Sequence, residues 1–167
     1  MRIYKIQEND IANGEGVRLS LFTQGCFKHC VGCFNKETWD IFDGREFTHD
    51  DYNYIMQELK KPQYSGLSVL GGEPMLWRYA IKKLCKDVKQ KFPDKTIWLW
   101  TGYEFEEVCD ICDSEKLDLL RYIDVIVDGE FDYEKRVYNQ FRGSSNQRII
   151  HLKEGKVDWI EGFKRIQ

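Results

Sequence analysis

The sequence predicts an α/β protein in which about five to six mostly parallel strands form a partial (β/α) barrel. Apolar runs that resemble strands alternate with amphipathic patterns long enough for helices, and this alternation is typical of right-handed strand–helix–strand units. The strands are too few for a complete eight-stranded barrel. The length of 167 residues fits one domain, so we expect residues 1–167 to fold together.

The predicted strands are short runs rich in β-branched and aromatic residues. The first, 17–22, alternates apolar and polar side chains. The tail that follows Lys153 has a weaker pattern. The complete set of predicted strands is 17–22, 67–70, 96–100, 123–127 and 148–152.

Three helices are predicted between these strands. The first begins near Thr48, because Thr48 and Asp51 fit the capping signal in which each residue bonds the backbone of the other. Its apolar residues recur at helical spacing until Pro62. The other two helices carry their apolar faces over residues 77–92 and 105–112.

Composition and charge exclude several classes of protein. Hydrophobic residues make up 42% of the chain and charged residues 32%, with a net charge of −3. An acidic chain does not suit general binding of nucleic acid. The sequence has no apolar run long enough to span a membrane and no secretion signal at its N-terminus. We therefore expect a cytoplasmic protein whose six cysteines serve a metal site or the core rather than disulfides.

Cys26, Cys30 and Cys33 form a C-x3-C-x2-C cluster directly after the first predicted strand. Thiolates this close together can hold one soft metal centre. Because most structural zinc sites use four protein ligands, three thiolates indicate a centre with one free coordination position. A zinc site completed by His29 or a distant residue, and a redox dithiol, are the alternatives.

The other three cysteines, Cys85, Cys109 and Cys112, lie on apolar helical faces, where free cysteine packs as a small hydrophobe. We predict that they belong to the core, although the last two form a C-x2-C pair. Trp98 and Trp100 lie on one side of their strand and are also expected in the core.

Several predicted strands end in turns of unusual composition. The carboxyl ends of parallel strands share one edge of a sheet, where ligands bind, so these turns should line one rim with the cysteine loop. Glycines there allow close approach to a ligand, and Asp128 is either a turn residue or a ligand contact. The turns are Gly71-Gly72-Glu73-Pro74, Thr101-Gly102 and Asp128-Gly129.

Two polar segments have less specific interpretations. The turn Asn13-Gly14-Glu15-Gly16 could let another chain approach closely. The segment from Arg142 to Arg148 is read as a solvated loop, with anion capture or partner docking as alternatives.

The cysteine spacing and Gly71-Gly72-Glu73-Pro74 together resemble the radical S-adenosylmethionine (SAM) superfamily. Further runs are similar to the branch that activates anaerobic (class III) ribonucleoside-triphosphate reductase. Glu15 stands where that branch commonly has proline, and Phe34 where tyrosine is usual; neither departure removes a cluster ligand. The runs are Asn13-Gly14-Glu15-Gly16-Val17-Arg18, Cys33-Phe34-Asn35-Lys36-Glu37-Thr38-Trp39, Trp98-Leu99-Trp100-Thr101-Gly102-Tyr103, Val127-Asp128-Gly129 and Arg142-Gly143-Ser144-Ser145-Asn146-Gln147.

The resemblance implies a partial barrel of the radical SAM type and a [4Fe-4S] cluster held by Cys26, Cys30 and Cys33. The amino and carboxylate groups of SAM would chelate the fourth iron. The residues implied as SAM contacts are Gly32, Cys33, Phe34, Gly71, Gly72, Glu73, Thr101 and Asp128.

The resemblance also implies an oxidoreductase. An electron from the cluster would cleave SAM, and the 5′-deoxyadenosyl radical would take a hydrogen atom from a glycine of the reductase, with a flavodoxin-like protein as the usual electron donor. No catalytic residue is expected beyond the cluster ligands. The alternatives are an activase of another glycyl radical enzyme such as pyruvate formate-lyase, a small-molecule radical SAM enzyme, and a non-catalytic iron–sulfur or zinc binding module.

Overall fold

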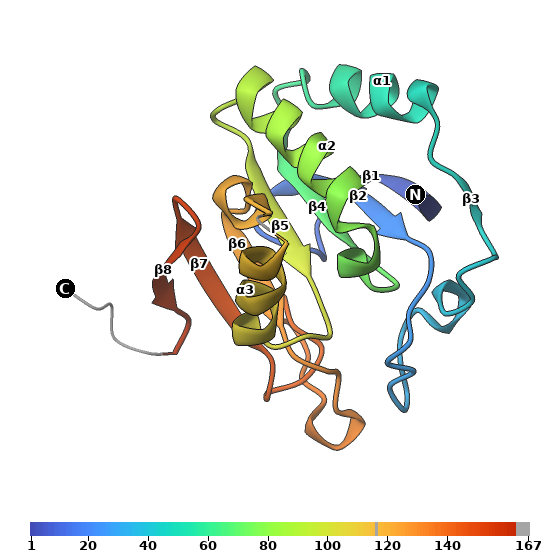
Figure 1. The fold of residues 1–167 in the computed structure, drawn as a ribbon, viewed down its shortest axis with the longest axis vertical. Coiled ribbons are helices and arrows are strands. Elements are labelled where there is room, and N and C mark those ends of the chain that lie inside the picture. The colour runs from blue at the N-terminus through green and yellow to red at the C-terminus, as the bar shows by residue number, and fades with distance from the viewer. Residues whose placement is uncertain (116, 163–167) are drawn as a thin grey trace.

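A mixed β-sheet forms the centre of the protein (Figure 1). The structure is a computed structural model that describes residues 1–115 and 117–162. Eight strands of these described residues are hydrogen-bonded in the order β3-β1-β2-β4-β5-β6-β7-β8. Their bounds are β1 Arg2–Asp10, β2 Val17–Thr23, β3 Arg45–Glu46, β4 Tyr64–Gly71, β5 Thr96–Trp100, β6 Val125–Asp128, β7 Arg148–Lys153 and β8 Lys156–Ile160.

The sheet is only partly parallel, which corrects the expectation of mostly parallel strands. Strands β2, β4, β5 and β6 pair in parallel, whereas β1, β3, β7 and β8 join them or each other antiparallel. For the last pair, the length of the connection explains the antiparallel orientation. Only two residues, Glu154 and Gly155, separate β7 from β8, and a short hairpin connection allows antiparallel pairing alone.

All five predicted strands exist, but β1, β3 and β8 were not predicted. The longest of them, β1, has the sequence RIYKIQEND, in which only Ile3 and Asp10 are buried. Two irregularities also interrupt its register with β2. Because the burial pattern is broken and most of its residues are polar or charged, β1 lacks the apolar alternation by which a strand is predicted.

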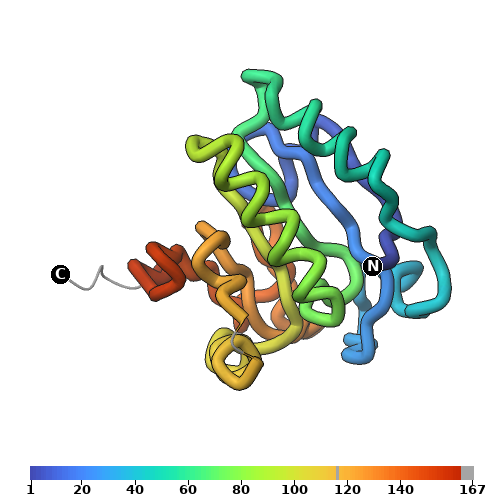
Figure 2. Tube along the Cα trace, turned by 45° about the horizontal axis from the view of Figure 1, so that its top comes forward, coloured from blue at the N-terminus to red at the C-terminus, as the bar shows by residue number. Residues whose placement is uncertain are grey.

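The three predicted helices, α1 His49–Glu58, α2 Arg78–Lys91 and α3 Phe105–Ser114, lie on one face of the sheet (Figures 1 and 2). The predicted start of α1 is confirmed: the Asp51 N–H donates to Thr48 Oγ1 at 3.2 Å, and the Thr48 N–H donates to the Asp51 carboxylate at 2.8 Å. A hydrogen bond from Arg45 lowers the pKa of Asp51 to about 2.

Cysteines of the helices lie in the core, as predicted. Cys85 and Cys112 are buried between sheet and helices, and the partly buried Cys109 packs against the same cluster. Burial raises the pKa of Cys112 to about 11. Thiols in such surroundings are protonated and act as apolar side chains.

The opposite face of the sheet holds a fully buried arginine. All five N–H groups of Arg18 donate to neutral acceptors on β4, β5 and the preceding turn. These acceptors are Ser68 Oγ at 2.6 Å, the Leu67 carbonyl at 2.8 Å, Thr96 Oγ1 at 3.0 Å, the Thr96 carbonyl at 2.8 Å and the Glu15 carbonyl at 3.1 Å. Burial lowers the pKa of Arg18 to about 10.

The glycine turn before β2 closes over this arginine. A Cβ atom on Gly14 would lie 2.9 Å from both Arg18 Cδ and Trp98 Cδ2. The close approach predicted for this turn is therefore made by side chains of the same protein. None of the described helices has the length and apolar character needed to cross a membrane.

Replacing Arg18 tests how much this buried network contributes to stability. We expect Arg18→Met to lower the free energy of unfolding by about 2–4 kcal/mol, because the carbonyl and hydroxyl acceptors would remain buried without donors. Urea denaturation of the metal-free chain measures the change. Arg121→Met, at an exposed position, is the matched control, and a loss no larger than that of the control would contradict the prediction.

Candidate functional site

One cavity of about 530 Å³ opens at the carboxyl ends of the parallel strands. Its lining includes Cys26 after β2, Gly71 at the end of β4, Thr101 after β5 and Gly129 after β6. The prediction that the unusual turns share one rim is confirmed. The cavity lies where α/β folds commonly bind their ligands.

The loop that carries the three cysteines is closed at its two ends by hydrogen bonds. The Gly25 N–H donates to the Thr38 carbonyl at 2.7 Å, and the Cys26 N–H donates to the Trp39 carbonyl at 3.0 Å. The buried Gln24 reinforces this closure, because its Nε2 donates to the Glu37 and Asp40 carbonyls. These bonds keep the loop folded back over the ends of β2 and β4.

The thiols of Cys26, Cys30 and Cys33 are free, partly buried and line the same cavity. Across residues 1–115 and 117–162, no three His, Cys, Asp or Glu side chains lie close enough together to share a single metal ion. A cubane cluster has a different requirement, because each thiolate binds a separate iron atom. Three thiols spread around one cavity therefore fit a [4Fe-4S] cluster in donor type and arrangement.

Backbone amides surround the sulfur atoms. Burial raises the pKa of Cys26 and of Cys30, while N–H donors from Lys28 and His29 to Cys26, and from Phe131 to Cys30, counteract part of that rise. The Asn35 N–H donates to Cys33 Sγ at 3.4 Å. Hydrogen bonds of this kind stabilise thiolate ligands and set the potential of a bound cluster.

His29, a possible zinc ligand in the sequence, makes an aromatic contact instead. Its ring stacks on Trp39, with centroids 4.6 Å apart. It is not among the described residues that line the cavity. The neighbouring Lys28 does line the cavity, and its ammonium group pairs with Glu130 at 2.8 Å.

Gly71 and Gly72 allow the end of β4 to lie against the cysteine loop. A Cβ atom on Gly71, whose φ is +110°, would lie 2.7 Å from the backbone N and O of Thr23, and one on Gly72 would lie 2.3 Å from the Gly25 carbonyl oxygen. Any side chain at either position would separate these segments. Both glycines also line the cavity.

The side chain of Glu73, only 2% exposed, joins the ends of β4 and β5. Its carboxylate accepts hydrogen bonds from the Met75 N–H at 2.9 Å, the Thr101 hydroxyl at 2.8 Å and the Gly102 N–H at 2.7 Å. Burial raises the pKa of Glu73 despite these donors. No sequence pattern indicates this bond between strands.

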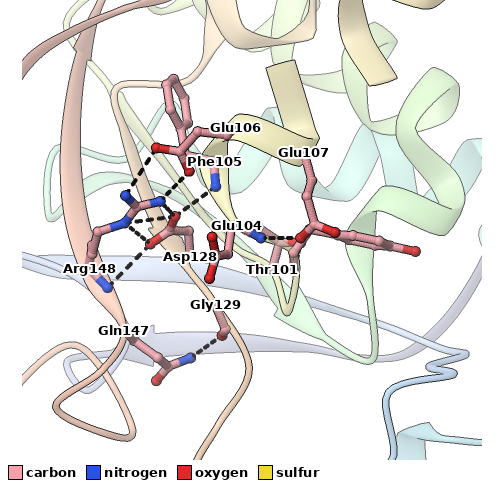
Figure 3. A network of polar contacts seen from close by, with 10 residues as sticks. Thr101, Glu104, Phe105, Glu106, Glu107, Asp128, Gly129, Gln147 and Arg148 are labelled. Carbon is pink, nitrogen blue, oxygen red and sulfur yellow. Dashed lines mark hydrogen bonds and ion pairs between the residues drawn. The ribbon is translucent and has the colours of Figure 1, made fainter. Parts of the chain in front are cut away.

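Asp128 lies behind the cavity rather than among its described lining residues. Its buried carboxylate accepts from the Phe105 N–H at 2.7 Å, at the start of α3, and pairs with the Arg148 guanidinium (Figure 3). Arg148 also pairs with Glu106 at 2.6 Å. These bonds join β6, β7 and α3, so the segment predicted as a solvated loop ends in a structural ion pair.

Gly32 and Phe34 contact the connection between β6 and β7. A Cβ atom on Gly32 would lie 2.3 Å from the Tyr133 ring, and Gly32 is not among the described lining residues. Phe34 does line the cavity, and its ring centroid lies 4.9 Å from that of Phe131. The connection thus packs directly on the end of the cysteine loop.

Some lining residues were not predicted. They include Ala12, directly before the glycine turn, Asn13 within it, and the segment 136–143. Neither region has the periodicity of a helix or strand, although the second overlaps the polar run from Arg142. Trp98 is buried as predicted, whereas Trp100 lines the cavity.

The bonds of Glu73 can be tested by Glu73→Gln, which keeps the shape but replaces one acceptor oxygen with a donor. We expect a loss of about 1–3 kcal/mol in the free energy of unfolding, because a buried donor would face another donor. Urea denaturation measures it, with Glu134→Gln at an exposed position as the control. Equal stability of the two variants would show that Glu73 does not join the strands.

Comparisons with known proteins agree with this site. The sequence pattern of a family described as a 4Fe-4S single cluster domain matches residues 12–150. An anaerobic ribonucleoside-triphosphate reductase-activating protein of Enterobacteria phage T4 is 38% identical over 157 residues, 93% of this chain and 97% of the relative. Proteins of the same name from Vibrio cholerae and Escherichia coli are 40% and 34% identical, covering 90% and 92% of this chain and 97% and 100% of the relatives. The chain therefore belongs to the 4Fe-4S single cluster domain family and to the family of the anaerobic ribonucleoside-triphosphate reductase-activating proteins.

Proposed function

We propose that this protein is a radical SAM activase that reductively cleaves S-adenosylmethionine at a [4Fe-4S] cluster and generates a glycyl radical on anaerobic ribonucleoside-triphosphate reductase. The observation that carries the proposal is the cavity in which Cys26, Cys30 and Cys33 lie beside Gly71 and Gly72. The printed names of the relatives supply the reductase as the partner.

The three thiolates would hold the cluster and leave one iron open, because no fourth cysteine of the described chain lines the cavity. When bound, the cluster and SAM would supply one-electron cleavage of the S–C5′ bond and the abstraction of a hydrogen atom from a glycine Cα. All remaining tasks of binding, orientation and water exclusion fall to the protein.

SAM would contact the lining residues Cys33, Phe34, Gly71, Gly72, Glu73 and Thr101. The hydroxyl of Thr101 and the carboxylate of Glu73 bond each other, so both act chiefly by fixing the turns that contact the cofactor. Gly32 and Asp128 would support the site without lining the cavity. Gly32 leaves room for the Tyr133 ring, and Asp128 accepts a hydrogen bond from the start of α3.

The shape of the cavity suits a protein substrate. Apolar side chains, among them Phe22, Leu70 and Trp100, line it and limit the access of water. Exposed residues at its edge, such as Phe34 and Tyr138, leave it open to a chain segment. A partly buried centre below an open edge suits hydrogen abstraction from a polypeptide.

The proposal includes three finer statements. The four parallel strands and their helices would form the partial barrel of the radical SAM type. A flavodoxin-like protein would donate the electron. The location would be cytoplasmic, because an oxygen-sensitive cluster on free thiolates needs a reducing compartment.

Cys30→Ala should abolish the cluster function while leaving the fold intact. We expect anaerobically reconstituted wild-type protein to bind about four iron atoms per chain and to cleave SAM, and the variant to bind fewer and to cleave none. Iron analysis, spin resonance and methionine release measure these outcomes. Cys109→Ala removes a thiol outside the cavity and is the control; SAM cleavage by Cys30→Ala would sink the mechanism.

The protein substrate can be identified by incubating the reconstituted protein with SAM, a reductant and either reductase or pyruvate formate-lyase. A glycyl radical should appear in the spin resonance spectrum of the reductase alone, because the relatives share that partner. A signal only on pyruvate formate-lyase, or on neither protein, would refute the assignment.

A further inference from the structure

The connection between β6 and β7 forms part of the cavity mouth. Its segment 136–142, here called the rim segment, lines the cavity. Tyr138 is 69% exposed and Arg136 is also exposed, whereas Phe141 is partly buried against Trp98. The rim segment therefore extends from the cavity wall to the surface.

The guanidinium group of Arg136 lies over two aromatic rings. Its guanidinium carbon lies 4.7 Å from the centroid of Phe34 and 4.9 Å from that of Tyr138. Stacking uses the faces of the guanidinium group and leaves its N–H groups directed outward in the plane. The side chain is thus oriented without using its hydrogen-bond donors.

No carboxylate of the described chain pairs with Arg136. Two acids of the same connection have other cations: Glu130 pairs with Lys28 and Asp132 pairs with Lys135. The second arginine of the rim segment, Arg142, donates to neutral oxygens, those of the Gln140 side chain and the Gln147 backbone, each at 2.8 Å. In a chain of net charge −3, the cavity mouth carries two arginines without an acidic partner.

We propose that Arg136 binds a carboxylate of the polypeptide substrate as that substrate enters the cavity. This inference rests on the proposed function and names the chemical group by which the partner is recognised. A planar guanidinium recognises a carboxylate with two parallel hydrogen bonds. Its exposure places the contact at the mouth, which any entering chain segment must cross.

The position of Arg136 also orients the substrate toward the cluster loop. Phe34, on which it stacks, directly follows Cys33, and Tyr133 of the same connection packs on Gly32. A carboxylate held by Arg136 would therefore lie at a constant place relative to the cysteine ligands. Arg136 acts as a positioning and specificity residue in this proposal.

The test compares Arg136→Gln, Arg136→Lys and the control Arg121→Gln, an exposed arginine away from the cavity. All are reconstituted with iron and checked for fold and iron content. We expect Arg136→Gln to raise the Kd for the reductase by about fivefold, the size of one partly exposed arginine–carboxylate contact. The Kd of Arg136→Lys should lie between those of the wild-type protein and Arg136→Gln, because lysine keeps the charge but loses the planar guanidinium group.

A second measurement separates binding from chemistry. The reductase concentration that gives half-maximal glycyl radical formation should rise for Arg136→Gln more than the maximal rate falls. The dependence of Kd on salt should also weaken in this variant, because one ion pair is lost.

Two outcomes would overturn the proposal. One is a Kd for Arg136→Gln within about twofold of that for Arg121→Gln. The other is a rise in the SAM concentration for half-maximal cleavage without reductase that exceeds the rise in Kd, since Arg136 would then serve the cofactor. If the wild-type protein binds the reductase but forms no glycyl radical, the proposed function fails, and the comparison of Kd values still decides the role of Arg136.

Discussion

The close backbone contact between the end of β4 and the start of the cysteine loop is the constraint on which the site depends. Gly71 and Gly72 lie against Thr23 and Gly25 at distances that leave no room for a Cβ atom. The Glu73 N–H also donates to the Gly25 carbonyl at 2.7 Å. Because this contact holds the loop over the strand ends, the cysteines lie beside the glycine turn and share one cavity with it.

The two faces of the sheet differ in the side chains that they bury. The helices bury an apolar cluster on one face, which supplies the hydrophobic stabilisation expected of an α/β fold. The other face carries Arg18, Ser68 and Trp98, closed at one end by the glycine turn. The Arg18 network begins near the amino end of β2, whereas the cavity opens at the carboxyl ends of the parallel strands.

Much of the parallel part of this fold follows from sequence patterns, because buried strands and amphipathic helices have strong periodicity. The strands β4 and β5 and the capping box of α1 are of this kind. Strand β1 has no such pattern, and its pairing depends on the neighbouring β2. The cysteine spacing and the glycine turn predict the two sides of the cavity, since their chemistry is local.

The remaining parts of the site depend on contacts between distant segments. The carboxylate of Glu73 meets Thr101 from the next strand, and Arg136 meets Phe34 across about a hundred residues of sequence. Asp128, at a strand end like the others, turns toward Arg148 instead of the cavity. Strand position predicts the edge on which a residue lies but not the direction of its side chain.

The closure of the cysteine loop has a consequence for how the protein is matured. The bonds between residues 24–26 and 37–40 use backbone groups and the Gln24 amide, and none of them uses sulfur. In zinc fingers the metal supplies the folding energy, so that metal loss unfolds the chain. Here the loop ends are secured by the polypeptide itself. Iron and sulfide can therefore be delivered to a chain that has already folded, and oxidative loss of the cluster would leave a scaffold that can be repaired rather than replaced.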